Sequence, residues 1–213
     1  LQSVDVVPTN LPTVLTELIG RSGEVERITD LLGRERLVTL TGVGGVGKTR
    51  LAIAIAAASV DSFPDGVWFA ELAAVTAGVK EVRAELETAR RELGRGHATV
   101  LFVDEVHRFS KAQQDVLLPA VENRLVTLIA ATTENPSFSV ISPLLSRSLL
   151  LRLQPLTTED LVALIDRALT DERGLRRATG EQFELSADAR DLIIRPSGGD
   201  ARRSSALMRA SSS

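Results

Sequence analysis

Short apolar runs alternate with amphipathic stretches along most of this chain. Five runs rich in branched aliphatic residues have the length and composition of buried strands. They lie at about 37–41, 67–70, 99–103, 126–131 and 149–153. Apolar residues at helical spacing predict helices between them, at about 24–32, 51–59, 79–93, 110–119 and 141–146. Alternation of this kind indicates parallel βαβ units, so we expect an α/β fold with helices on both faces of one five-stranded sheet.

The strand pattern stops after Pro155, and only helices are expected from there on. Thr157 followed by Asp160 is a typical helix start. Helices are predicted at about 158–171, 186–194 and 200–210. We therefore predict two parts, an αβα domain at 1–155 and a small helical lid at 156–213 that leans on the first domain.

A complete phosphate-binding pattern, G-x-x-x-x-G-K-T, joins the first strand to the following helix. Glycines allow backbone N–H groups to close around phosphate oxygens, and the helix N-terminus adds its positive end. We expect Lys48 to reach the β- and γ-phosphates and Thr49 to place its hydroxyl on Mg²⁺. The alternative is an ordinary glycine-rich turn. The candidate nucleotide-binding residues here are Gly42, Val43, Gly44, Gly45, Val46, Gly47, Lys48, Thr49 and Arg50.

Two carboxylates follow the strand at 99–103, at the edge where ligands bind in parallel sheets. We expect Asp104 to hold Mg²⁺, mostly through water, and Glu105 to orient or deprotonate the attacking water. Thr132, Thr133 and Asn135 end the next strand, which is expected between the loop strand and the acidic strand, where a polar side chain could touch the γ-phosphate. The alternatives are a solvated acidic turn and a capped turn before Pro136.

Two arginines have positions suited to phosphoryl transfer. Arg147 follows a short apolar helix, where a neighbouring subunit could dock, and an arginine supplied in trans stabilises transition-state charge. Arg202 opens the last predicted helix and could reach back to the γ-phosphate. A surface arginine is the alternative reading at both positions.

Composition narrows the class of protein further. The 213 residues carry a net charge of −3, no cysteine and two histidines, His97 and His107. These counts argue against a disulfide framework, a zinc site and a strongly basic surface for nucleic acid. No apolar stretch is long enough for a membrane span, so no membrane partner is expected and the cytoplasm is the expected location.

Several motifs from about 72 to 209 resemble the replication-associated recombination protein A family. They are FVDEVHRFSKAQQD, ATTENPSF, LLSR and GDARR, together with the segment LAAVTAGVKEVR. The resemblance implies an AAA+ P-loop ATPase, a three-layer αβα sandwich with a lid. It implies ATP or ADP with Mg²⁺ as ligands, and DNA or replication proteins as partners. It makes Thr132 or Thr133 sensor 1, Arg147 a trans arginine finger for self-association, and Arg202 sensor 2.

The first third of the chain, about 8–71, resembles instead the nucleotide-binding domain of STAND-class (NB-ARC-like) bacterial transcriptional regulators. The resemblance lies in NLP, IGR, LVTLTG, the phosphate loop and FPDGVWF, and it implies that Ile19, Gly20 and Arg21 line an adenine pocket. The two resemblances meet at Leu72 to Val75, just after the second strand, which suggests a recombined or engineered chimera. The chain also ends after the expected sensor 2 helix, before the oligomerisation region of the recombination family.

We therefore predict an ATP-binding AAA+ module that hydrolyses ATP to ADP and phosphate. Two alternatives stay open at this point. One is a STAND-type nucleotide switch with little turnover, and the other is an engineered chimera without a working site. The DNA substrate, protein partners and oligomeric state do not follow from the sequence.

Overall fold

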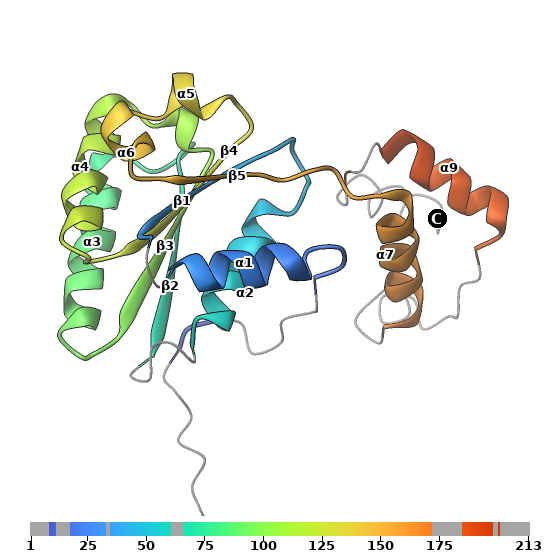
Figure 1. Cartoon of the computed structure of the whole chain (residues 1–213), viewed down its shortest axis with the longest axis horizontal. Coiled ribbons are helices and arrows are strands. Elements are labelled where there is room, and N and C mark those ends of the chain that lie inside the picture. Colours follow the sequence, from blue (N-terminus) through green and yellow to red (C-terminus); the bar gives the residue numbers. More distant parts are fainter. Residues whose placement is uncertain are drawn as a thin grey trace, which may run out of the picture. The chain divides into compact units, whose positions relative to one another are not determined.

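The chain forms two compact units, one of residues 1–41 with 48–152 and the other of residues 42–47 with 153–213. The computed structural model describes residues 9–11, 18–32, 35–60, 66–171, 185–197 and 200. The first unit contains a sheet flanked by helices, and the second contains helices α7 and α9 (Figure 1). Each unit is described below by itself.

Five parallel strands form the sheet of the first unit, as the sequence predicts. They are β1 (Leu37–Thr41), β2 (Val67–Ala73), β3 (Ala98–Asp104), β4 (Thr127–Thr132) and β5 (Leu149–Arg152). The strand order is β2-β3-β4-β1-β5, so β4 lies between the loop strand and the acidic strand, as predicted. Parallel pairing places the carboxyl ends of β1, β3 and β4 at one edge of the sheet, where ligands bind in parallel sheets.

Helices cover both faces of this sheet. They are α1 (Ser22–Leu32), α2 (Lys48–Ala58), α3 (Val79–Leu93) and α4 (Lys111–Glu122), and the short helices α5 (Pro136–Ser139) and α6 (Ser142–Leu145) follow β4. Figure 1 shows α3 and α4 together on one face and α1 with α2 on the other. A continuous core joins α3 and α4 to the strands, with Leu86, Leu117, Leu101 and Leu128 buried in it. Burial of these apolar side chains, each contributing roughly 1.5–3 kcal/mol, is what fixes the helices on the sheet.

Several element boundaries differ from the sequence expectation, and α4 and α9 (Ala187–Ser197) each end three residues beyond the predicted end. β2 continues to Ala73, where Leu72 pairs with Val103 and Ala73 with Asp104, so the predicted seam begins inside the strand and not after it. β2 is an edge strand with Glu71 exposed, and its second half therefore lacks the continuous apolar run of a central strand. The four-residue α5 was read only as a turn, because Asn135 and Pro136 signal both a turn and a short helix start.

The second unit contains α7 (Thr158–Thr170) and α9 (Ala187–Ser197). Ile165 and Ile193 are buried against each other, and Arg190 pairs with Asp166 at 2.7 Å. Thr157 caps α7 as predicted, because its side chain accepts a hydrogen bond from the Asp160 backbone N–H at 3.2 Å. The helix predicted at 200–210, with Arg202, lies outside the described residues.

Gln114 is a buried polar side chain that ties α4 to the segment carrying α5 and α6. Its amide nitrogen donates to the carbonyl oxygens of Phe109 at 3.2 Å and Ser139 at 2.9 Å. Its amide oxygen accepts from the Ile141 N–H at 2.9 Å. Since the side chain is 2% exposed, water does not replace these bonds if they are lost.

Gln114→Leu is expected to lower the free energy of unfolding by about 2–5 kcal/mol, because one buried and two partly buried backbone groups lose their hydrogen-bond partner. Urea unfolding followed by circular dichroism measures the change. Asp115→Leu is the matched control, since Asp115 is exposed on the same helix, and its effect is expected within about 0.5 kcal/mol. Equal unfolding midpoints for the Gln114 and Asp115 variants would contradict this role.

Candidate functional site

Glycines in left-handed conformations shape the loop Gly42–Gly47, which carries the phosphate-binding pattern. Gly45 and Gly47 have φ of +74° and +93°, a conformation that favours glycine. A Cβ atom added at Gly44 or Gly47 would meet none of the described atoms within 4 Å, so the backbone there is open to a ligand. At Gly45 an added Cβ would come within 1.9 Å of Asp200 Oδ1, so Gly45 is also required for packing.

Lys48 and Thr49 stand at the start of α2, directly after this loop. The first turn of α2 contains no acidic residue, so no side chain of that turn offsets the positive end of the helix dipole. Lys48 is 7% exposed and Thr49 is half-buried. A positive helix end with an ammonium group and a hydroxyl has the chemistry that a phosphate and its cation require.

Asp104 and Glu105 end β3, and the backbone turns sharply between them and the next element. Glu105 has φ 55° and ψ 44°, the left-handed conformation, and it leads into the short helix η2 (Val106–Arg108). The Glu105 N–H donates to Asp104 Oδ1 at 3.0 Å. A left-handed glutamate costs about 1–2 kcal/mol, and strain of this kind concentrates at functional sites. Because of this turn, the carboxylates of Asp104 and Glu105 have different hydrogen-bond partners, although the two residues are adjacent in sequence.

Thr133, the residue that follows β4, contacts Glu105. Thr133 donates from its hydroxyl to Glu105 Oε2 at 3.3 Å. Thr132 is fully buried, and its Oγ1 accepts from the Glu134 N–H at 3.0 Å. Asn135 instead caps α5, where its Oδ1 accepts from the Ser137 N–H at 3.0 Å. The structure thus brings Thr133 to the acidic pair, while Asn135 caps the short helix α5 where the alternative was a capped turn before Pro136.

His107 is a residue of this cluster that the sequence reasoning missed. Its Nδ1 lies 3.0 Å from Thr132 Oγ1 and its Nε2 lies 3.2 Å from Glu105 Oε2. The available signal was its place two residues after Glu105, on the turn that leaves the acidic strand. In the described residues, no group of three or more histidine and acidic side chains is arranged to hold a metal ion.

The second histidine, His97, follows α3 and pairs with Glu92 in the last turn of that helix. His97 Nδ1 lies 2.8 Å from Glu92 Oε2, and this hydrogen bond lowers the pKa of the Glu92 carboxyl below its usual range. Arg95 also pairs with Glu92, at 2.7 Å. The two histidines therefore have separate carboxylate partners.

Arg147 lies at the surface just after α6, held by its own chain. Its Nη2 pairs with Glu122 Oε1 at 2.9 Å and its Nη1 donates to the Pro143 carbonyl at 2.8 Å. The side chain is 47% exposed. Within the described part of the chain, these contacts and a weaker one to Ser146 do not include Glu105 or Thr132. The guanidinium is thus presented at the surface.

The remaining predicted residues are Ile19, Gly20 and Arg21, expected in an adenine pocket, and Arg50, expected to contact the nucleotide. Gly20 has φ +68°, and Arg21 is buried and paired with Glu24 at 2.8 Å. Ile19 is half-buried and Arg50 is exposed. Their assignment to an adenine pocket and to nucleotide contacts stays a prediction.

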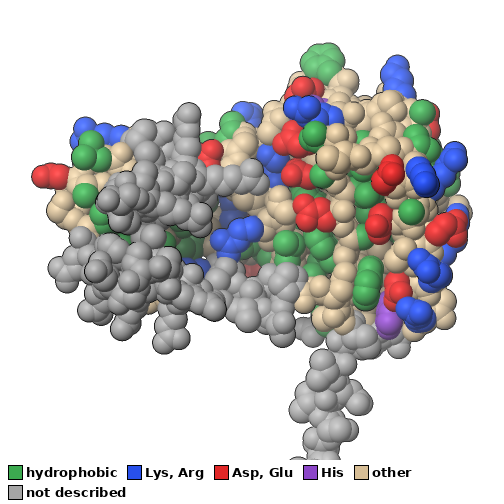
Figure 2. All heavy atoms as spheres, turned by 180° about the vertical axis from the view of Figure 1, so that it is seen from behind, with side chains coloured by type: hydrophobic (Ala, Val, Ile, Leu, Met, Phe, Trp, Pro, Cys, Tyr) green, Lys and Arg blue, Asp and Glu red, His purple; other side chains and the backbone are tan. Residues whose placement is uncertain are grey.

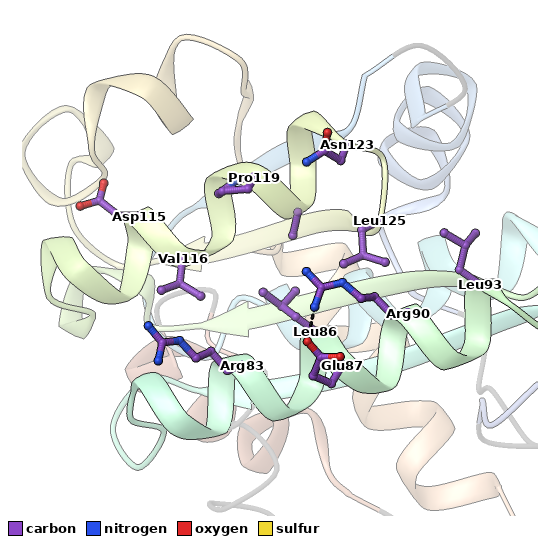
Figure 3. A pocket seen from close by; sticks show the side chains of 11 residues that line it. Arg83, Leu86, Glu87, Arg90, Leu93, Asp115, Val116, Pro119, Asn123 and Leu125 are labelled. Carbon is purple, nitrogen blue, oxygen red and sulfur yellow. Dashed lines mark hydrogen bonds and ion pairs between the residues drawn. The ribbon is translucent and has the colours of Figure 1, made fainter.

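A separate pocket lies between α3 and α4. Figure 3 shows Leu86, Val116 and Leu125 at its apolar floor and Arg83 and Asp115 at its rim. Glu87 and Arg90 form an ion pair beside it. On the face shown in Figure 2, acidic and basic side chains are interspersed, in agreement with the absence of a basic surplus in the sequence.

Comparison with known proteins shows which family this chain matches. The family described as "ATPase family associated with various cellular activities (AAA)" matches residues 38–155. An uncharacterized AAA domain-containing protein of Mycobacterium tuberculosis is 49% identical over 198 residues, covering 90% of this chain and 41% of that protein. Replication-associated recombination protein A of Escherichia coli is 43% identical over 172 residues, covering 80% of this chain and 36% of that protein.

Solved structures agree with these matches. A point mutant of RuvB from Thermotoga maritima superposes with a TM-score of 0.68 at 29% identity, covering 93% of this chain and 64% of that one. The chain thus spans about two fifths of the length of the curated relatives named here. Among the described residues, no helix combines the length and apolar character needed to cross a membrane.

Proposed function

Because the chain belongs to the AAA family of ATPases, we propose that it is an ATP-binding module that hydrolyses ATP to ADP and phosphate. One observation carries the proposal: the sheet order puts β4 between the loop strand β1 and the acidic strand β3, and Thr133 bonds to Glu105 across that edge. A phosphate bound at Lys48 and Thr49, which follow β1, would therefore lie on the same edge of the sheet as a carboxylate that can orient water.

The proposed roles follow from the chemistry of each side chain. Lys48 holds the phosphates and Thr49 and Asp104 supply oxygen ligands, which Mg²⁺ prefers. When bound, Mg²⁺ would neutralise charge on the phosphate oxygens. Glu105 orients and deprotonates the attacking water, while Thr132 and Thr133 support it. Arg147 acts on a neighbouring subunit, and Arg202 contacts the γ-phosphate from the helical lid.

The relatives suggest the setting in which this activity is used. One is named for replication-associated recombination, so we propose that DNA or a replication protein is the partner and that the cytoplasm is the location. The net charge of −3 predicts that this stretch of chain binds DNA weakly by itself. Self-association through the surface around Arg147 is part of the same proposal.

Two measurements on the unmodified chain test the function. Titration calorimetry with ATP and Mg²⁺ tests binding, and steady-state phosphate release with and without DNA tests turnover. Binding with turnover supports the ATPase. Binding of ADP without turnover would support the STAND-type switch, and absence of binding would support a chimera without a working site. The match that covers 90% of the chain includes most residues before Leu72, and it does not favour these alternatives.

Arg147→Ala is expected to lower hydrolysis at least about tenfold in preparations that associate, because it removes a cation from the neighbour's transition state. Turnover is measured over a range of protein concentrations, with light scattering to determine mass. Arg91→Ala is the matched control, since Arg91 is an exposed arginine on α3. An equal loss of turnover in a proven monomer would contradict the trans role.

A further inference from the structure

A line of polar contacts connects the end of β4 to Glu105 through His107. The Glu134 N–H donates to Thr132 Oγ1 at 3.0 Å, and Thr132 Oγ1 lies 3.0 Å from His107 Nδ1. His107 Nε2 lies 3.2 Å from Glu105 Oε2. Thr132 is fully buried and the His107 side chain is 10% exposed, so water does not readily replace these partners.

The partners of the imidazole assign its hydrogens. A carboxylate only accepts hydrogen bonds, so the contact with Glu105 is favourable when Nε2 carries the hydrogen. In the neutral ring Nδ1 is then an acceptor, and Thr132 donates its hydroxyl hydrogen to it. The Thr132 oxygen meanwhile accepts from the Glu134 N–H. Each group of the line thus has a compatible donor or acceptor.

In this arrangement both threonines act on Glu105, Thr133 directly and Thr132 through His107. The single hydroxyl hydrogen of Thr132 points to His107 and therefore acts on Glu105 through the imidazole. Thr133 donates to the same carboxylate oxygen, Oε2, at 3.3 Å. Within the described part of the chain, Glu105 Oε1 makes no hydrogen bond, so Oε2 is the anchored oxygen and Oε1 is the one left to receive a hydrogen from water.

We propose that His107 is a positioning residue for ATP hydrolysis, holding the Glu105 carboxylate in place through the contact that Thr132 orients. The inference rests on the function proposed above. Glu105 has a left-handed backbone, so its side chain is not directed by β3 alone and needs partners that fix it. Glu134 Oε1 lies 3.9 Å from the same Nε2, so the imidazole faces a second, weaker carboxylate partner.

The test compares four variants for the Kd of ATP and the kcat of phosphate release. His107→Ala is expected to lower kcat by roughly 10–100-fold and to change the Kd less than about threefold, because only the base is misplaced. His107→Gln should recover part of this loss, because its amide donates to Glu105 and accepts from Thr132. Thr132→Val should also lower kcat, and the double variant His107→Ala with Thr132→Val should be no slower than His107→Ala.

Several results would overturn the inference. They are a His107→Ala variant with unchanged kcat, losses that multiply in the double variant, and a parallel weakening of ATP binding. If His107→Ala does not fold, two other measurements test the inference. They are the ratio of kcat between wild type and His107→Gln, and the kcat of Thr132→Val. His97→Ala is the control, because His97 pairs with Glu92 at the end of α3 and should leave kcat unchanged.

Failure of this inference is distinguishable from failure of the proposed function. If Glu105→Gln abolishes phosphate release and His107→Ala does not lower it, only the role of His107 is wrong. If the wild-type chain releases no phosphate at any protein concentration, with or without DNA, the function itself is wrong.

Discussion

Glu105→Gln is expected to lower ATP turnover by at least about 100-fold while ATP binding stays within a few-fold of wild type. The amide keeps the size of the carboxylate, and its oxygen can still accept from Thr133, but it cannot take a proton from water. The loss should therefore appear in kcat and not in the Kd of ATP. Phosphate release at saturating ATP and titration calorimetry separate the two quantities.

The matched control for this variant is Glu71→Gln, an exposed glutamate on β2. It changes the net charge by the same amount and should leave both quantities unaltered. Turnover of Glu105→Gln within twofold of wild type would remove Glu105 from the mechanism. Since Thr133 and His107 are placed around Glu105, their proposed roles would then also need a different explanation.

Lys48→Ala is expected to weaken ATP binding by about 100-fold, because hydrogen bonds to charged groups contribute roughly 1.5–3 kcal/mol each and the ammonium faces the most highly charged part of the ligand. Lys48 is nearly buried at the start of α2, directly after the phosphate-binding pattern. Calorimetry with ATP and Mg²⁺ measures the change, and turnover should fall with it at fixed ATP concentration.

The chain offers a close control, because it has only three lysines, Lys48, Lys80 and Lys111. Lys111 is exposed at the start of α4, so Lys111→Ala also removes a lysine from the beginning of a helix. That variant should bind ATP as the wild type does. Equal affinities for the Lys48 and Lys111 variants would exclude the phosphate loop as the binding site, and thermal unfolding would show whether the Lys48 variant is folded.

Much of the first unit could be predicted from local sequence. The central strands β1, β3 and β4 are continuous apolar runs because both of their faces are buried, and the structure has them within one or two residues of the prediction. The edge strand β2 was predicted three residues too short, because Glu71 interrupts its pattern. Arg202 lies outside the described residues, so its helix and its contact with the γ-phosphate stay predictions.

The candidate site also has one part that local sequence predicts and another part that it does not. Gly42 to Thr49 and the Asp104–Glu105 pair are each contiguous in sequence, and their chemistry can be recognised without knowing the fold. The partners of Glu105 could not be recognised so easily. Thr133 comes from 28 residues later in the chain, and the role of His107 depends on the left-handed turn at Glu105.

The sequence by itself determined the class of fold, the phosphate loop and the acidic pair, because each depends on neighbouring residues and on the period of apolar positions. Only the tertiary structure decided which oxygen of Glu105 is anchored, which threonine contacts it directly and which side chains His107 contacts. Those contacts exist because β4 lies between β1 and β3 in the sheet, so that the ends of β3 and β4 are neighbours. Strand order is set by packing over the whole sheet, so residues distant in sequence acquire their roles only there.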